Sequence, residues 1–149
     1  MYRFMMRLTI GYPTRDREIQ MAQGFLNGQT PDTVEAVCTP ADILELQKEV
    51  QNIKVNDLVL GYIEDLMDLT RKEERFVLGA SPRAMLALIR GAQARAFLQG
   101  RDFVKPDDVK MMAEVILLHR LVLTSDARIR KENPAAILKS LVVKAKIPV

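Results

Sequence analysis

The stretch Gly79-Ala80-Ser81-Pro82-Arg83-Ala84 decides the fold, because it marks the start of the longest helix that the sequence predicts. The hydroxyl of Ser81 can accept a hydrogen bond from a free backbone N–H of the first helical turn, and Pro82 suits that turn because it needs no N–H there. Aliphatic residues at helical spacing follow, and Gly100 ends the pattern. The sequence therefore predicts a helix from Pro82 to about Gln99.

Arg83 stands in the first turn of this helix, where a cation does not help the helix itself. The helix macrodipole disfavours positive charge at this end, whereas the free N–H groups favour an anion. A guanidinium beside those groups adds a planar and permanently charged ligand for phosphate. Two interpretations of Arg83 follow from the residues: contact with an anion, or an exposed side chain that reaches into water.

Similar start signals predict further helices along the chain. Thr39-Pro40-Ala41-Asp42 combines a capping hydroxyl, a proline and a carboxylate, and Lys105-Pro106-Asp107-Asp108 places acids in a first turn. Apolar residues at helical spacing follow both stretches. We expect helices over residues 14–27, 41–51, 56–69, 82–99, 106–120 and 135–144.

The composition supports an all-α fold, a small helical bundle. Aromatic residues make up 5% of the 149 residues and Trp is absent, whereas Leu, Ala, Met and charged residues are common. Helices packed through aliphatic side chains have this composition, and an all-β sandwich does not.

The first residues show a different pattern. Phe4, Met6, Leu8 and Ile10 alternate with residues of the opposite side, as in a strand, and Gly11-Tyr12-Pro13 ends the alternation. A lone strand is a poor independent unit because its backbone groups lack partners. We expect a short N-terminal β-strand that belongs to a larger sheet.

The sequence lacks the residues that ATP hydrolysis by this chain alone would require. It has no G-x-x-x-x-G-K-[ST] stretch and no apolar strand that ends in paired acids for Mg²⁺. His119 has no partners for a catalytic triad, and a helix-end or packing role is expected for it. The single cysteine, Cys38, has no partner for a disulfide or a zinc site, which favours a free thiol in a reducing, intracellular compartment.

The ordered motifs of the chain resemble those of the C-terminal lid of MoxR-type AAA+ ATPases. The resemblance rests on the stretches Gly79–Ala84, Gly100–Val109 and His119–Leu123, which occur in the order of that family. Arg3-Phe4 and the residues as far as Glu18 resemble the point where the core of such proteins meets the lid. The resemblance covers nearly the whole chain and implies three parts: the last strand of the AAA+ core (1–13), a connecting helix and loop (14–38), and a helical lid domain (39–149).

The resemblance also implies roles for particular residues. Arg83 matches the second sensor arginine, which contacts the γ-phosphate of ATP, with Ser81 and Pro82 in the same nucleotide-binding motif. Arg3 matches an arginine finger, although Tyr2 stands where the family has an acid. ATP and Mg²⁺ are implied for the complete protein, with neither expected on this chain alone.

The family's partners would be the AAA+ core of the same protein, neighbouring subunits of a ring, a von Willebrand A domain protein, and client enzymes that receive chaperone-like help. A cytoplasmic location without a membrane span is implied as well.

A basic helical DNA-binding or adaptor module is the alternative. The net charge is +3, and acidic residues predominate in residues 1–75 while basic residues predominate afterwards. A basic half can face nucleic acid, nucleotide or an acidic neighbour, or it can simply be solvated. No helix carries the dense mixture of Lys or Arg with Asn, Gln or aromatic residues that base contacts require, which disfavours DNA binding.

Overall fold

The computed structural model describes residues 4–29 and 35–146, which divide into two compact units. The larger unit contains residues 4–7 and 47–146, and the smaller unit contains the described residues between 8 and 46. Each unit is considered by itself.

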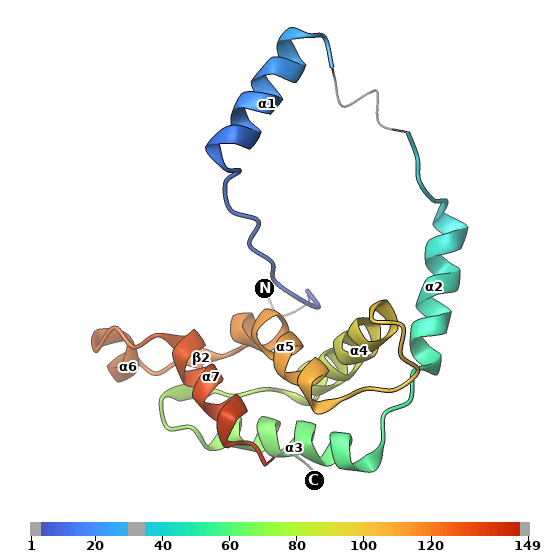
Figure 1. Cartoon of the computed structure of the whole chain (residues 1–149). Coiled ribbons are helices and arrows are strands. Elements are labelled where there is room, and N and C mark those ends of the chain that lie inside the picture. Colours follow the sequence, from blue (N-terminus) through green and yellow to red (C-terminus); the bar gives the residue numbers. More distant parts are fainter. Residues whose placement is uncertain (1–3, 30–34, 147–149) are drawn as a thin grey trace. The chain divides into compact units, whose positions relative to one another are not determined.

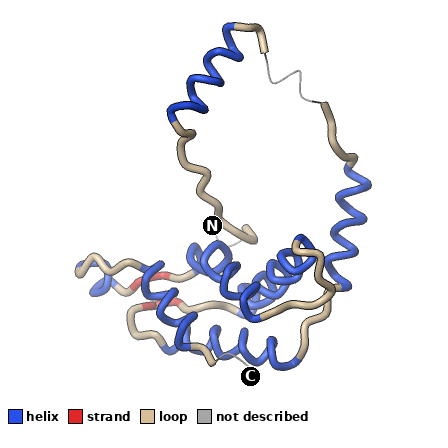
Figure 2. The backbone as a smooth tube through the Cα atoms, viewed as in Figure 1, coloured by secondary structure: helices blue, strands red, loops and turns tan. Residues whose placement is uncertain are grey.

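Helices make up most of the described chain, with two short strands (Figures 1 and 2). In chain order the elements are α1 (Arg15–Leu26), α2 (Pro40–Asn52), α3 (Asp57–Lys72), β1 (Phe76–Leu78), α4 (Pro82–Leu98), α5 (Pro106–Leu117), the 3₁₀ turn η2 (Leu118–Arg120), β2 (Val122–Leu123), α6 (Ser125–Ile129) and α7 (Pro134–Lys144). The predicted all-α fold is confirmed.

Side-chain caps fix where several helices begin. The Oδ1 atom of Asn56 accepts a hydrogen bond of 2.8 Å from the N–H of Val59, at the start of α3. Asn133 caps α7 in the same way through the N–H of Ala135. These caps replace the intrahelical partners that a first turn lacks, which is why the local sequence predicted the helix starts.

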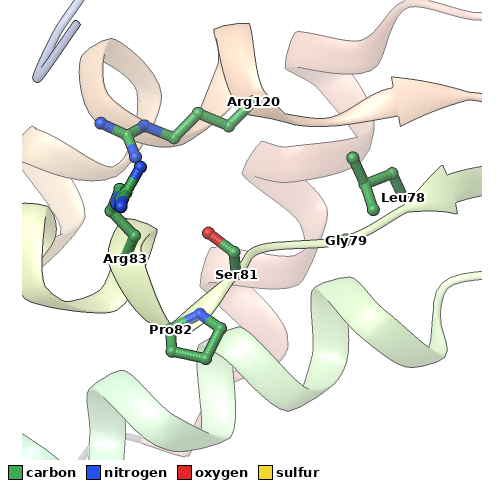
Figure 3. A pocket seen from close by; sticks show the side chains of 6 residues that line it. All are labelled: Leu78, Gly79, Ser81, Pro82, Arg83 and Arg120. Atoms are coloured by element: carbon green, nitrogen blue, oxygen red, sulfur yellow. The ribbon is translucent and has the colours of Figure 1, made fainter. Parts of the chain in front are cut away.

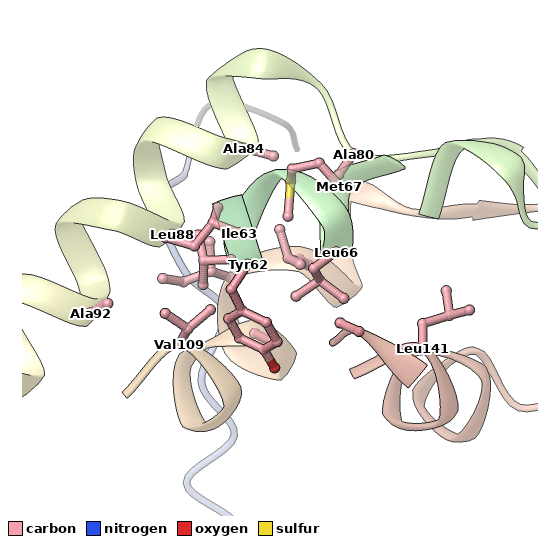
Figure 4. Packing of buried hydrophobic residues seen from close by; sticks show 14 of the residues in the cluster. Tyr62, Ile63, Leu66, Met67, Ala80, Ala84, Leu88, Ala92, Val109 and Leu141 are labelled. Atoms are coloured by element: carbon pink, nitrogen blue, oxygen red, sulfur yellow. The ribbon is translucent and has the colours of Figure 1, made fainter. Parts of the chain in front are cut away.

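The core of the larger unit lies where α3, α4, α5 and α7 meet. Figure 4 shows side chains of α3, among them Tyr62 and Leu66, packed between those of α4 and α7. Tyr62, Ile63, Leu66 and Met67 are all 1% exposed or less. Burial of this apolar stripe provides the main favourable free energy of folding.

A glycine lets α4 lie close against α5. A Cβ atom at Gly91 would overlap the side chain of Ile116 in α5. Other small residues of α4, Ala84, Ala92 and Ala96, are completely buried. The absence of a side chain at Gly91 therefore permits the close approach of the two helices at this point.

The two strands connect distant parts of the larger unit. β1 pairs antiparallel with β2, with Phe76 opposite Leu123 and Leu78 opposite Val122. Phe76 is buried, and the backbone N–H of Thr124 also bonds to the carbonyl of Arg75. Residues 76–78 therefore form an extended link between α3 and α4.

The predicted N-terminal strand is wrong for the described residues, because residues 4–14 form no strand. The described chain provides no neighbouring strand with which their backbone could pair. The backbone of residues 4–7 bonds instead to α5 and η2, for example from the N–H of Arg7 to the carbonyl of Val115 at 2.8 Å. Alternation in sequence indicated extended chain, but a strand also requires a partner.

The polar stretch after β2 contains a short helix that the sequence pattern did not predict. Thr124 accepts a hydrogen bond from the N–H of Ala127 and so begins α6. The helix is only five residues long. No apolar periodicity can be recognised over so short a segment.

A buried carboxylate holds the start of α5. Asp108 is 3% exposed, and both its oxygens accept hydrogen bonds from Arg101, at 2.7 and 2.8 Å. It also accepts from the backbone N–H of Lys105 at 2.8 Å. Burial raises the pKa of Asp108. These hydrogen bonds and the positive charges of Arg101 and Arg95 lower the pKa by more, so it lies below its ordinary value.

We expect truncation of the α3 stripe to destabilise the fold. Leu66→Ala should lower the free energy of unfolding by about 2–5 kcal/mol, since Leu66 is completely buried. Leu58→Ala on the same helix is the matched control, because Leu58 is 60% exposed and its loss should change stability by about 0.5 kcal/mol or less. Urea unfolding followed by circular dichroism measures both, and equal effects would contradict the packing described.

Asp108→Asn should lower the free energy of unfolding by roughly 3 kcal/mol at neutral pH, because Arg101 would lose its counter-charge. A lowered folded pKa means that Asp108 contributes stability above the unfolded pKa of about 3.9 and loses it as the pH falls through the folded value. The difference in free energy of unfolding between the unchanged chain and the variant should therefore become smaller below pH 4, which unfolding curves measured at several pH values would show. Asp107→Asn, at a neighbouring exposed position, should change stability by less than about 1 kcal/mol at any pH.

Candidate functional site

The predicted start of α4 is built as the sequence indicates. Ser81 has an extended backbone, and its Oγ atom accepts a hydrogen bond of 3.3 Å from the N–H of Ala84. Pro82 occupies the first turn. The hydroxyl of Ser81 therefore caps the helix, and its assignment to nucleotide binding stays a prediction.

The backbone just before this helix is held by α3. Thr70 Oγ1 accepts a hydrogen bond of 3.0 Å from the N–H of Ala80, and the Nε atom of Arg71 donates one of 2.9 Å to the carbonyl of the same residue. Thr70 is completely buried and its hydroxyl donates to the carbonyl of Met67. Two adjacent side chains of one helix thus fix both polar groups of the Ala80 backbone.

Gly79 is required by the close approach of α3. A Cβ atom at Gly79 would lie 2.7 Å from the Cα of Arg71 and 2.7 Å from the carbonyl oxygen of Thr70. Both are backbone atoms, which cannot rotate away as a side chain can. The glycine lets the chain pass directly over the end of α3 and into α4.

Sequence reasoning did not find the roles of Thr70 and Arg71. The charged run from Arg71 to Arg75 is expected to be a solvated helix end, and no local signal shows which of its members turns back onto the chain. Arg71 also pairs with Glu64 at 3.3 Å, which keeps its guanidinium beside α3.

Arg83 lies on the rim of a cavity of about 420 Å³ (Figure 3). The residues that line the cavity are Leu78, Gly79, Ser81, Pro82, Arg83 and Arg120. Figure 3 shows the side chains of Arg83 and Arg120 reaching toward one another across it. Arg120 lies within the stretch His119–Leu123, but the sequence alone indicates no role for it.

The electrostatics of this cavity favour an anion. Two guanidinium groups and the first turn of α4 face it, and none of the described residues that line it carries a carboxylate. Burial lowers the pKa of Arg120, and the positive charge of Arg83 lowers it further. An anion between the two arginines would reduce both unfavourable effects.

Arg120 is the more buried of the two arginines. It is 6% exposed, whereas Arg83 is exposed. One of its terminal nitrogens, Nη2, donates to the carbonyl of Phe4 at 2.8 Å and to that of Met5 at 3.2 Å. Nε of His119 also lies 3.1 Å from the Phe4 carbonyl. The helix-end role expected of His119 is consistent with this contact.

Arg3, which the sequence suggested as an arginine finger, lies outside the described residues. No group of three or more His, Cys, Asp or Glu residues within residues 4–29 and 35–146 is arranged to hold a metal ion. Cys38 is exposed and unpaired. No helix in the described part of the chain is long and apolar enough to cross a membrane.

Comparisons with known proteins match this architecture. A family model described as the AAA lid domain matches residues 68–141, which include the cavity residues and run from the end of α3 into α7. The chain is 35% identical to the uncharacterised protein YeaC of Bacillus subtilis and 31% identical to the chaperone MoxR1 of Mycobacterium tuberculosis. Residues 68–141 thus match an AAA lid domain, and the chain is homologous to MoxR-family proteins over nearly its whole length.

Both alignments take in almost all of this lid chain, 99% of it for YeaC and 98% for MoxR1. They cover 46% and 41% of those two proteins, so the chain spans about half the length of the curated relatives it matches. A crystal structure of a candidate ATPase from Cytophaga hutchinsonii has the same fold, with a TM-score of 0.89 at 28% identity. That match covers 98% of this chain and 47% of the other.

Gly79→Ala should destabilise the lid and displace the start of α4, because the added methyl group meets backbone on two sides. We expect a loss of about 2–4 kcal/mol in the free energy of unfolding. Gly61→Ala is the matched control: a Cβ atom there meets nothing within 4 Å, and in the interior of α3 alanine should stabilise by about 0.5–1 kcal/mol. Thermal unfolding of the two variants should show shifts of opposite sign.

Proposed function

We propose that this lid senses nucleotide in a MoxR-type AAA+ ATPase, with Arg83 as the residue that contacts a terminal phosphate of ATP. The observation that carries the proposal is the cavity at the start of α4, which two arginines and the first turn of the helix face without a lining carboxylate. Such an arrangement suits a polyphosphate better than any neutral ligand.

The attachment of α4 supports the coupling part of the proposal. Arg83 follows directly on a backbone that α3 holds through Thr70 and Arg71. A displacement of the Arg83 guanidinium would therefore also displace the packed helices, because no flexible loop separates Arg83 from α3. Binding of ATP or ADP would in this way bias the position of the lid as a body.

Catalysis would take place only in the complete protein. There, a phosphate-binding loop and a strand that ends in paired acidic residues would bind ATP and Mg²⁺; this sequence contains neither motif. Arg83 would stabilise the charge that develops during phosphoryl transfer. Arg3 would serve as an arginine finger toward a neighbouring subunit. Chaperone-like action on client complexes, as the name of MoxR1 suggests, would follow from lid movement in a ring, with a von Willebrand A domain protein as a further partner.

In the complete protein, Arg83→Ala should lower kcat for ATP hydrolysis by about 10-fold or more, because a charge-stabilising contact in the transition state is lost. Steady-state phosphate release measures this. Arg130→Ala is the matched control, since Arg130 is an exposed arginine away from the cavity whose guanidinium pairs with Asp126. Both variants should unfold at nearly the same temperature.

Unchanged turnover in Arg83→Ala would refute the sensor assignment. A titration with duplex DNA separates the alternative function: binding that weakens steeply with salt would indicate a nucleic-acid module, because phosphate contacts release counterions.

A further inference from the structure

We propose that Arg120 is a positioning residue that joins the anion cavity at Arg83 to the segment of residues 4–7, so that an anion in the cavity fixes where this segment lies. The inference rests on the proposed function, because it takes a phosphate group as the anion.

The guanidinium of Arg120 lies between the cavity and the backbone of residues 4 and 5. On one side it lines the cavity opposite Arg83 (Figure 3). On the other side its Nη2 atom donates to the backbone carbonyls of Phe4 and Met5. A guanidinium is planar and rigid, so a shift of the group toward an anion also moves the donor that holds these carbonyls.

Arg120 is also a buried charge without a counter-charge. The described residues provide no acceptor for its Nε atom, which is shielded from water. Arg101 shows the ordinary arrangement, since two of its nitrogens bond to the carboxylate of Asp108. A buried cation whose partners are carbonyls alone is costly, and the charge of Arg83 adds to the cost. An incoming phosphate would supply the missing negative charge.

The segment of residues 4–7 is attached weakly enough for a shift of Arg120 to change its position. Its bonds to the rest of the larger unit run through backbone atoms of the segment: the carbonyls of Phe4 and Met5, and the N–H of Arg7, which donates to the carbonyl of Val115. The side chain of Met6 packs at the edge of the core, whereas Phe4 is 70% exposed and Met5 38% exposed. A few hydrogen bonds with little buried apolar area form a weak attachment that a change at Arg120 can shift.

Met5 provides a direct readout because it also lines the groove that continues from the cavity past Arg83 and Arg120. The segment therefore contacts the same two arginines through its backbone and through one side chain. In chain order it directly follows Arg3, so an anion at Arg83 would influence the residues next to the proposed arginine finger.

The test is a titration of the 149-residue chain with inorganic tripolyphosphate at constant ionic strength. The signals to follow by NMR are the Nε–H groups of the arginines and the methyl group of Met5. We expect Arg83, Arg120 and Met5 to shift together with one dissociation constant. Shifts at Arg83 alone would overturn the role of Arg120 and leave the proposed function intact, whereas no shift at Arg83 would overturn both.

A pair of variants tests the positioning role separately. Arg120→Lys keeps the charge but loses the planar group that reaches both carbonyls and the cavity, so tripolyphosphate affinity should fall about 10-fold and the Met5 shift should vanish. Arg130→Lys is the control, since Arg130 is exposed and pairs with Asp126 on α6. A Met5 shift that survives in a folded Arg120→Lys variant would refute the proposal. If that variant does not fold, the titration of the unchanged chain decides the question.

Discussion

The hold of α3 on the backbone of Ala80 is the interaction on which the candidate site depends. Thr70 and Arg71 bind the N–H and the carbonyl of this single residue, and Gly79 allows the approach. Because both polar groups are satisfied, the chain has one low-energy path from β1 into α4. The direction of the first turn of α4, and with it the place of Arg83, follows from a contact between two helices.

Two charged side chains, Asp108 and Arg120, are buried in the part of the chain that the structure describes, and their surroundings differ. Asp108 is fully paired with Arg101 and with a backbone N–H, and it fixes the loop before α5. Arg120 has only carbonyl partners and faces a second cation. The first arrangement is that of a structural ion pair, and the second leaves an electrostatic deficit that a ligand can fill.

Sequence reasoning predicted best what local chemistry determines. Asn56 and Ser81 cap helices through atoms within three residues, so the starts of α3 and α4 could be predicted from short stretches. The same reasoning placed Arg83 at a helix start that the structure confirms. It failed where the partner is distant: Arg71 turns back to Ala80, and Arg120 reaches residues more than a hundred positions earlier. Spacing within a segment carries no information on such contacts.

The N-terminal residues show why a correct pattern can still give the wrong structure. Ile10 and Tyr12 are 99% and 97% exposed, although their alternation is that of a half-buried strand. Exposed apolar residues in such a pattern carry unfavourable hydration that only a further surface can remove. In residues 4–7 the backbone finds polar partners in Arg120 and Val115, and the side chain of Met6 packs against the core. The alternation thus marks apolar side chains that the described residues leave exposed. The hydrogen bonds of Arg120 to the carbonyls of Phe4 and Met5 show how the start of this segment is held although it pairs with no strand.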